Sequence, residues 1–440
     1  MAFRLMQLVL LAASFSGIAA LRAAKASVAS GYSFEKFSAD FGRSYVPGTQ
    51  EYKHRELLFQ ASVSEIHATN AKNLKEGRFW KAGVHPFMDW TEAERRTMNG
   101  YKPSHSRGSV IAALQTGERG TATSFSSTNS TAKRWLSSAR VGLSGGLSME
   151  RGPAIRNQGD CGSCWAISAV EAVEARLVPR DSDATPPKVS AQALVDCVPN
   201  PRHCGGSGGC DGATGELAYA FMRDYGIPTE SELPYEGATG ACPTALSGPW
   251  PAAQRVIVSG WNQLPSNRVE PLMKALVQDG PVVVAVDGGS WFNYDSGVFD
   301  GCSKDAVLSH AVLAKGYGEE AGHKYWLILN SWGREWGEQG HIRLQRHEDE
   351  NAWCGTDNKP KDGVGCDGGP EEVTVCGMCG LLYDPIFPEG VRLEKGGSNI
   401  PSEVPVAAFH AGPLPSSSGH GHGADEDFDA LLRRMSQDSA

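Results

Sequence analysis

The sequence predicts an α+β fold for the largest unit of this 440-residue chain. Segments 164–177 and 215–225 are expected to be helices, the first because it is rich in Ala and Glu with Ile167, Val170 and Val173 on one side. Short apolar segments typical of strands follow at 282–286, 307–317, 325–332 and 341–344. Helices first and strands later within one unit indicate two halves that face each other.

Composition and charge exclude some classes of protein. The formal net charge is −9 at pH 7, which argues against nucleic acid as a partner because phosphate binding needs basic surfaces. All 11 cysteines lie between Cys161 and Cys379, so this part is expected to fold in an oxidising compartment. The length allows two or three folded units.

The N-terminus resembles a secretory signal peptide, which we place at residues 1–22. Arg4 precedes an apolar stretch from Leu5 to Ala20 that ends in small residues. A membrane anchor is the alternative, but the stretch is short of the roughly 20 apolar residues that span a bilayer. We therefore expect a soluble mature protein without stable membrane insertion, delivered to a lysosome, a vacuole or the extracellular space.

The next part of the chain, residues 31–103, is expected to be a small helical unit. Leu57, Leu58, Val63 and Ile66 recur at helical spacing, with charged residues on the other face. Three further parts follow: a linker at 104–146, the α+β unit at 147–390 and a disordered tail at 391–440.

Two features of the linker and the tail bear on chemistry. Asn129-Ser-Thr in the linker is an acceptor sequon and is expected to be glycosylated. His420 and His422 in the tail lack further metal ligands nearby, so we expect no metal site there.

The strongest local signal is the segment Gln158-Gly-Asp-Cys-Gly-Ser-Cys-Trp165 at the start of the first predicted helix. A cysteine at a helix N-terminus is near the positive end of the dipole, which favours the nucleophilic thiolate. A redox pair or half of a zinc site are the alternatives for Cys161 and Cys164. The only candidate second half-site, Cys376-Gly-Met-Cys379, is more typical of disulfides in such a chain.

A thiolate nucleophile also needs an imidazole, and His310 is the best candidate. It lies in an apolar segment, where a histidine is unfavourable unless it has a function. Asn330 closes the next predicted strand, and its amide oxygen can accept from the imidazole and fix the ring's tautomer. Trp332 can exclude water from that hydrogen bond.

Segments 158–165, 308–317 and 325–346 resemble the papain family of cysteine proteases. The resemblance implies a two-lobed fold, with a helical lobe and a β-barrel-like lobe. It also implies that Cys164 is the nucleophile, His310 the acid/base and Asn330 the orienting residue. Gln158 would donate to the oxyanion together with the backbone N–H of Cys164. The residues implied to bind substrate are Gly212, Ala213, Trp332 and Trp336, the two tryptophans on the leaving-group side.

The helical unit resembles the inhibitory prosegment of the same family. The matching positions are Glu51, Arg55, Phe59, Ser62, Ile66 and Asn70, then Gly83, His85, Phe87 and Asp89. Ser62 and His85 stand where asparagine is usual. The resemblance implies inhibition at neutral pH that weakens in acid, through protonation of Asp89 and of His85 if buried. The alternative is an accessory helical domain.

The chain departs from the family pattern at several points. The usual start of the mature enzyme is missing, and Gly212-Ala213 replaces Gly-Gly. Two further residues are inserted before Phe221, so the wall of the substrate pocket has no assignment by register. By motif, disulfides are expected at Cys161–Cys210 and Cys197–Cys242. Cys302 has two candidate partners, Cys354 and Cys379. We favour Cys379 because the spacing from Cys379-Gly to Pro388 resembles that of the family, which makes residues 351–378 an insertion.

These residues together predict a monomeric zymogen of a cysteine endopeptidase that needs no cofactor and acts on peptides and proteins. Three alternatives remain open. An exopeptidase would need a blocking element, for which 351–378 is a candidate. A catalytically dead binding protein and a transglutaminase-like acyl transferase fit the complete set of four site residues less well.

Overall fold

The computed structural model describes residues 31–100, 152–178, 185–242 and 254–395. The predicted signal peptide, the whole linker with Asn129, and residues 396–440 of the tail lie outside the described residues. Within the described residues, no helix is long and apolar enough to cross a membrane.

The first half of the main unit is a cluster of helices. Helix α6 (Cys164–Leu177) has the predicted bounds and is buried on all sides from its start to Glu174. Helices α7 (Ala191–Cys197) and α8 (Gly215–Tyr225) pack against it. Ala and Val dominate the buried face of α6, because only small side chains let helices and a sheet approach it together.

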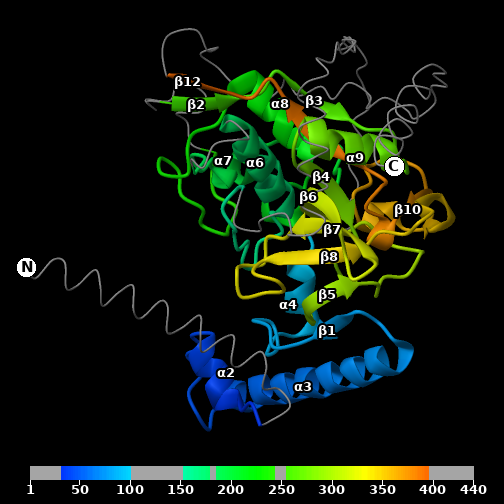
Figure 1. The fold of residues 1–440 in the computed structure, drawn as a ribbon. Helices are drawn as coiled ribbons and strands as arrows, with labels where there is room; N and C mark the ends of the chain where they lie inside the picture. The colour runs from blue at the N-terminus through cyan, green and yellow to red at the C-terminus, as the bar shows by residue number, and fades with distance from the viewer. Residues whose placement is uncertain (1–30, 101–151, 179–184, 243–253, 396–440) are drawn as a thin grey trace, which may run out of the picture.

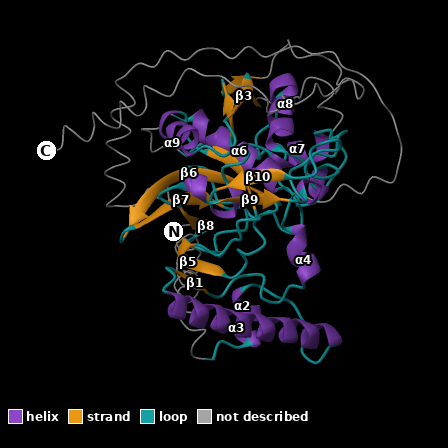
Figure 2. Ribbon diagram, turned by 90° about the vertical axis from the view of Figure 1, so that its right-hand side faces the viewer, coloured by secondary structure: helices purple, strands orange, loops and turns teal. Residues whose placement is uncertain are grey.

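The second half is built on one twisted sheet, as the strand-like segments predict. Among the described residues its strand order is β1-β5-β8-β7-β6-β4-β11-β3. The central strands are β4 (Val282–Val286), β6 (His310–Glu320), β7 (His323–Leu329) and β8 (His341–Gln345). The outer ones are β3 (Gly260–Gln263), β5 (Tyr294–Phe299) and β11 (Ile386–Glu389). Helix α9 (Val269–Gln278) packs against β6, and α6 covers β6 from the other side (Figures 1 and 2).

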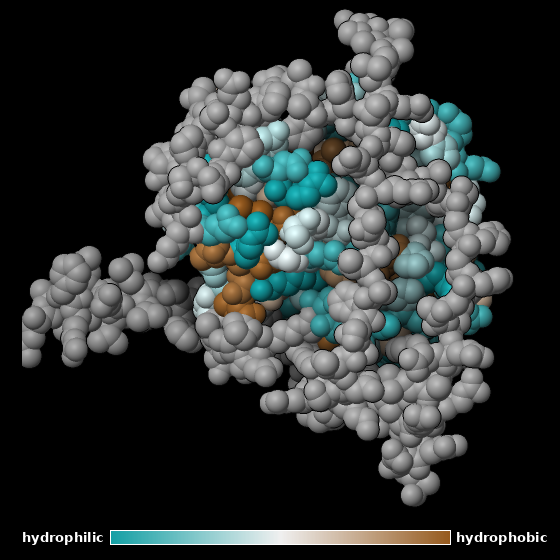
Figure 3. All heavy atoms as spheres, turned by 90° about the horizontal axis from the view of Figure 1, so that it is seen from above, coloured by the Kyte–Doolittle hydropathy of each residue, from teal (hydrophilic) through white to brown (hydrophobic). Residues whose placement is uncertain are grey.

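The N-terminal unit comprises α2 (Phe34–Asp40), α3 (Gln50–Glu76), β1 (Trp80–Ala82) and α4 (Glu92–Thr97). Strand β1 pairs antiparallel with β5 and so adds an edge strand to the sheet of the main unit. Figure 1 shows this unit at the end of the molecule opposite β2 (Gln254–Ile257) and β12 (Arg392–Lys395), with α4 reaching up toward α6. The described residues visible from above include both hydrophilic and hydrophobic side chains (Figure 3).

Three sequence predictions are wrong in detail. Leu57 is 64% exposed, because the buried face of α3 is formed by Phe59, Ser62, Ile66 and Asn73 instead. The segment expected to be a strand from residue 307 becomes one only at His310. The tail was expected to be disordered from residue 391, yet β12 pairs with β2 and extends the folded unit to at least Lys395.

Five disulfides cross-link the main unit internally. They are Cys161–Cys210, Cys197–Cys242, Cys204–Cys366, Cys302–Cys379 and Cys354–Cys376. Cys302 thus joins Cys379 rather than Cys354, and the segment 351–378 carries its own hairpin. The hairpin consists of β9 (Cys354–Asp357) and β10 (Val373–Cys376), which pair antiparallel.

Candidate active site

Cys164 is the first residue of α6, and its thiol is in none of the five disulfides. The side chain is fully buried. The backbone N–H of Ala311, on β6, donates to its sulfur at 3.3 Å. The thiol therefore lies between the start of the helix and the start of the strand, where backbone N–H groups from both elements favour negative charge on sulfur.

The imidazole of His310 is held by an amide from the neighbouring strand. Nε2 of His310 donates to Oδ1 of Asn330 at 2.8 Å, and both side chains are fully buried. Strands β6 and β7 are antiparallel neighbours, so the start of β6 and the end of β7 lie side by side. Within the described residues Nδ1 of His310 has no hydrogen-bond partner. Because Asn330 occupies Nε2, the remaining ring nitrogen is the one that can exchange a proton with a nucleophile.

Aromatic rings enclose this hydrogen bond. The ring of Trp332 lies 5.1 Å from that of His310, centroid to centroid, and Trp336 lies edge-on to Trp332 at 5.0 Å. Trp332 is fully buried. Water is thereby excluded from the imidazole–amide pair, which strengthens the hydrogen bond.

Gln158 provides a side-chain amide beside Cys164. Its Nε2 donates to the backbone oxygens of Cys161 and Met98, both at 2.9 Å. The hydroxyl of Ser331 donates to the Gln158 Oε1 at 2.6 Å and so fixes which end of the amide points to the site. Ser331 was not among the predicted site residues, although it lies in the Asn-Ser-Trp motif that identified Asn330.

The last described residues of the N-terminal unit, 98–100, lie across this site. A Cβ on Gly100 would lie 2.2 Å from the Cys164 sulfur and 2.7 Å from the Gly162 oxygen. A Cβ on Gly212 would lie 1.9 Å from the Gly100 oxygen. Residues 98–100 therefore occupy a groove formed by Gln158, Gly162, Cys164 and Gly212, and backbone rather than side chain covers the thiol.

Aromatic packing fixes the N-terminal unit to the main unit. Phe87 is 3% exposed and lies edge-on to Trp332 and Phe292, each at 5.7 Å between ring centroids. Trp80 packs on Phe299 at 4.7 Å, and its indole N–H donates to Asp300 at 2.9 Å. These rings bury apolar area from both units, which is the main source of affinity at such an interface.

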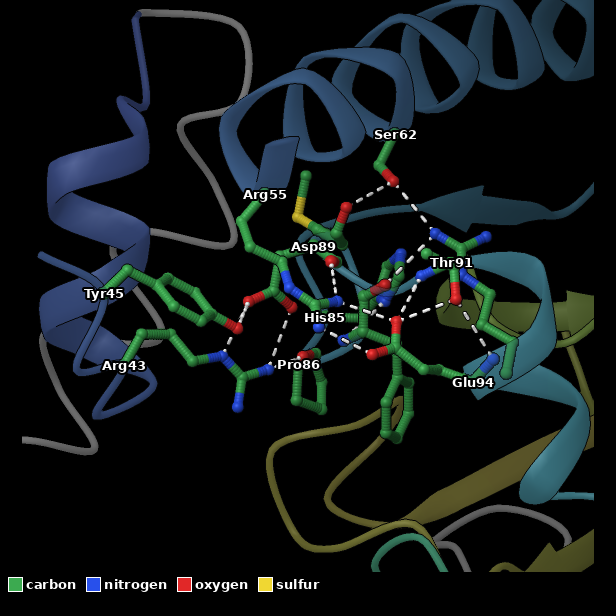
Figure 4. Close-up of polar contacts among 12 residues, drawn as sticks. Arg43, Tyr45, Arg55, Ser62, His85, Pro86, Asp89, Thr91 and Glu94 are labelled. Carbon is green, nitrogen blue, oxygen red and sulfur yellow. Dashed lines mark hydrogen bonds and ion pairs between the residues drawn. The ribbon is translucent and has the colours of Figure 1, made fainter. Parts of the chain in front are cut away.

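The N-terminal unit is itself held by a network around the buried carboxylate of Asp89 (Figure 4). Arg43 donates to both Asp89 oxygens at 2.9 and 3.0 Å, and the Tyr45 hydroxyl donates at 2.8 Å. Arg55 binds the Asp89 backbone oxygen and the carboxylate of Glu94. The hydrogen bonds from Arg55 lower the pKa of Glu94 to about 2.

Two positions where this unit departs from the family pattern keep a hydrogen-bonding role. The Ser62 hydroxyl donates to the Met88 backbone oxygen at 2.8 Å and accepts from Arg95 at 2.9 Å. The ring of His85 is fully buried and its Nε2 bonds Asn293 Oδ1 at 2.8 Å, so this residue contacts the main unit directly.

A two-lobed fold whose own N-terminal segment fills the groove at a buried thiol has the architecture of a thiol protease zymogen. Comparison with known proteins agrees. Residues 150–364 match the papain family cysteine protease domain, and residues 34–94 match the cathepsin propeptide inhibitor domain.

Several characterised proteins are similar over most of their length. A KDEL-tailed cysteine endopeptidase of Arabidopsis thaliana is 36% identical over 309 residues, which is 69% of this chain and 78% of the relative. A senescence-specific cysteine protease of the same plant is 34% identical over 324 residues, 71% and 84% of the two chains. The structure of digestive procathepsin L2 proteinase from Tenebrio molitor larval midgut superposes with a TM-score of 0.57 at 27% identity, over 81% of this chain and 98% of that one. The stem bromelain precursor gives 0.54 at 27% identity, over 81% and 97%.

The chain belongs to the papain family of cysteine proteases. It is a cysteine-type peptidase with a papain-like α+β fold and an N-terminal propeptide inhibitor domain, as the sequence motifs predict.

Burial sets the protonation of the imidazole in this form of the protein. Desolvation lowers the pKa of His310 from 6.5 to about 4, and the hydrogen bond to Asn330 opposes the shift. The buried imidazole is therefore neutral above about pH 4, whereas an exposed one gains a proton below 6.5. Protonation thus favours conformations that expose the ring, and the stability of the closed form falls as the pH drops through this range.

We expect the His310 imidazole to titrate near pH 4 in the full chain and at higher pH after the N-terminal unit is removed, because removal readmits water to the groove. Histidine NMR titration of both forms checks this, with His310→Gln to assign the signal. Equal pKa values in the two forms would contradict the role given to burial.

Proposed function

We propose that the chain is the zymogen of an endopeptidase in which Cys164, His310 and Asn330 carry out peptide-bond hydrolysis. The observation that carries the proposal is the His310–Asn330 hydrogen bond of 2.8 Å, made through Nε2, beside a buried thiol at the start of α6. This arrangement leaves Nδ1 to exchange a proton with sulfur or with the leaving group.

The residues then act in a fixed order in the reaction. The Cys164 thiolate attacks the scissile carbonyl carbon, and the new oxyanion accepts from Gln158 Nε2 and from the Cys164 backbone N–H. The imidazolium of His310 protonates the amine as the C–N bond breaks. Water then attacks the acyl-enzyme, gives its proton to His310, and releases the thiolate and the acid product.

The 98–100 segment inhibits by occupying the positions that substrate needs. The Met98 carbonyl accepts from the Gln158 amide at 2.9 Å, so the oxyanion donor is already engaged. Gly100 covers the sulfur, and Gly212 contacts the Gly100 carbonyl. Gly212 and the adjacent Ala213 would hold substrate backbone in the same way on the acyl side, with Trp332 and Trp336 on the leaving-group side.

The five disulfides support folding in the secretory pathway. We infer delivery to an acidic lysosome or vacuole, or secretion. An acidic compartment would favour opening of the groove through protonation of His310, whose pKa burial lowers to about 4.

An irreversible epoxide inhibitor of thiol proteases tests the proposed function. The processed protein should lose peptidase activity at a stoichiometry of one, and peptide mapping should place the adduct on Cys164. The full chain should react far more slowly, because Gly100 covers the sulfur. Inactivation without an adduct at Cys164, or no peptidase activity in the processed protein, would overturn the proposal.

Phe87→Ala is expected to weaken inhibition by the N-terminal unit at least about 30-fold, because it empties a buried aromatic position against Trp332 and Phe292. The inhibition constant of residues 31–103 on the processed enzyme measures this. Leu57→Ala is the matched control, because Leu57 is 64% exposed on the outer face of α3. Inhibition within threefold of the parent would contradict the role of Phe87.

A further inference from the structure

The segment 351–378, which the sequence analysis interprets as an insertion, is bonded to both halves of the main unit. Its residues 363–367, named the strap here, follow the short helix Pro360–Asp362. Gly363 and Val364 are buried, and residues 365–367 are partly exposed.

One end of the strap is fixed to the helical half. The Gly205 N–H donates to the Gly365 oxygen at 3.1 Å, and the Asp367 N–H donates to the Arg202 oxygen at 2.8 Å. Between these two bonds lies the Cys204–Cys366 disulfide. Residues 365–367 therefore run alongside 202–205 as a backbone-bonded, covalently fixed pair.

The other end is fixed to the sheet half, two residues before His310. The Val364 N–H donates to the Leu308 oxygen at 2.9 Å. A Cβ on Gly363 would lie 2.3 Å from the same Leu308 oxygen, so only glycine allows this approach. The Leu308 N–H donates to the buried carboxylate of Asp357, which belongs to the insertion as well.

Gly212 is the link between the strap and the occupied groove. Its Cβ position would lie 1.9 Å from the Gly100 oxygen and 2.2 Å from the Gly205 oxygen. A peptide backbone that takes the place of Gly100 is thus separated from the strap only by Gly212 and Gly205. Val364 is buried and belongs to the large apolar core that also contains Leu308, Ala213 and Cys164.

We propose that the strap forms a wall of the substrate groove on the Gly212 side. Val364 on this wall limits the size of the substrate side chain bound there, and the chemistry that it favours is a small aliphatic residue. The Cys204–Cys366 bridge fixes the distance between the strap and the helical half. The inference rests on the proposed function, in which Gly212 holds the acyl part of the peptide.

Two variants of the processed enzyme test this proposal. Val364→Ala shortens the side chain on the wall, which widens the groove, and leaves the disulfides intact. Cys204→Ser/Cys366→Ser removes the covalent link between the strap and the helical half. Cys354→Ser/Cys376→Ser is the matched control, because it removes a bridge that joins β9 to β10 within the same insertion.

The measurement is kcat/KM on two peptide sets, one varied on the acyl side of the scissile bond and one on the leaving side. With Val364→Ala we expect the ratio of kcat/KM for Phe over Val at the acyl-side position to rise at least about tenfold. The Cys204/Cys366 variant should raise it in the same direction. The leaving-side ratios and the control variant should stay within twofold of the parent.

Acyl-side ratios unchanged in Val364→Ala would overturn the proposal, as would an equal change in the control variant. Titration of active thiol normalises each preparation, so partial misfolding does not alter the ratios. A parent enzyme that cleaves no peptide would instead overturn the proposed function, which separates the two failures.

Discussion

Replacing Cys164 by serine is expected to lower kcat/KM of the processed enzyme by at least about 10⁴-fold. A hydroxyl is far less acidic than a thiol, so neither the start of α6 nor the Ala311 N–H, 3.3 Å from the sulfur, stabilises an anion on serine at neutral pH. The substitution removes the proposed nucleophile and leaves the groove, the imidazole–amide pair and the proposed oxyanion donors in place.

The fold should survive this change, because Cys164 is buried but in none of the five disulfides and serine is slightly smaller. Thermal unfolding and a disulfide map of the Cys164→Ser zymogen are the controls. The variant should also stay bound to its N-terminal unit, since Met98 still reaches the Gln158 amide. Activity above about one per cent of the parent would reject Cys164 as the nucleophile.

Much of this site could be predicted from sequence because its residues lie in short continuous motifs. Gln158 lies in the short segment that leads into α6, and Cys164 is the first residue of that helix. Asn330 and Ser331 are adjacent in sequence. The pairing of His310 with Asn330 follows from two consecutive antiparallel strands, which the apolar segments already indicate. Local order of this kind needs no knowledge of distant contacts.

Contacts between distant parts of the chain are not marked by any short motif in the sequence. Strand β1 has three residues, and its pairing with β5 depends on an edge that forms only when the sheet does. The Cys204–Cys366 bridge joins residues 162 apart in sequence, and neither spacing nor motif selects it among the possible partners. The proposed wall formed by the strap depends on that bridge, so the sequence could not predict it either.

Periodicity alone also misplaced one face of a helix. The apolar residues of α3 suggested a stripe through Leu57, but tertiary contacts bury Phe59, Ser62 and Asn73 instead. Ser62 and Asn73 are polar and are buried because each side chain donates to a backbone oxygen, of Met88 and Trp80. A hydrophobic pattern cannot reveal polar residues that are buried for this reason.

Gln158→Ala is expected to lower kcat/KM by about 10² to 10³-fold, the effect typical for loss of one oxyanion donor. The loss should fall on kcat, because the charge on oxygen develops only in the transition state. Inhibition by the N-terminal unit should weaken only up to about tenfold, because Met98 offers the amide a neutral carbonyl and loses a single hydrogen bond.

Two further variants separate catalysis from structure. Ser331→Ala removes the hydroxyl that orients the Gln158 amide at 2.6 Å, so it should lower kcat roughly tenfold and leave KM and the pH profile unchanged. Gln192→Ala removes another buried amide, on α7, and should lower stability but not kcat. Steady-state kinetics on one peptide measure kcat and KM of each variant, and thermal unfolding measures its stability. A Gln158→Ala enzyme within threefold of the parent, or an equal loss of kcat in Gln192→Ala, would show that the Gln158 amide holds the fold rather than the oxyanion.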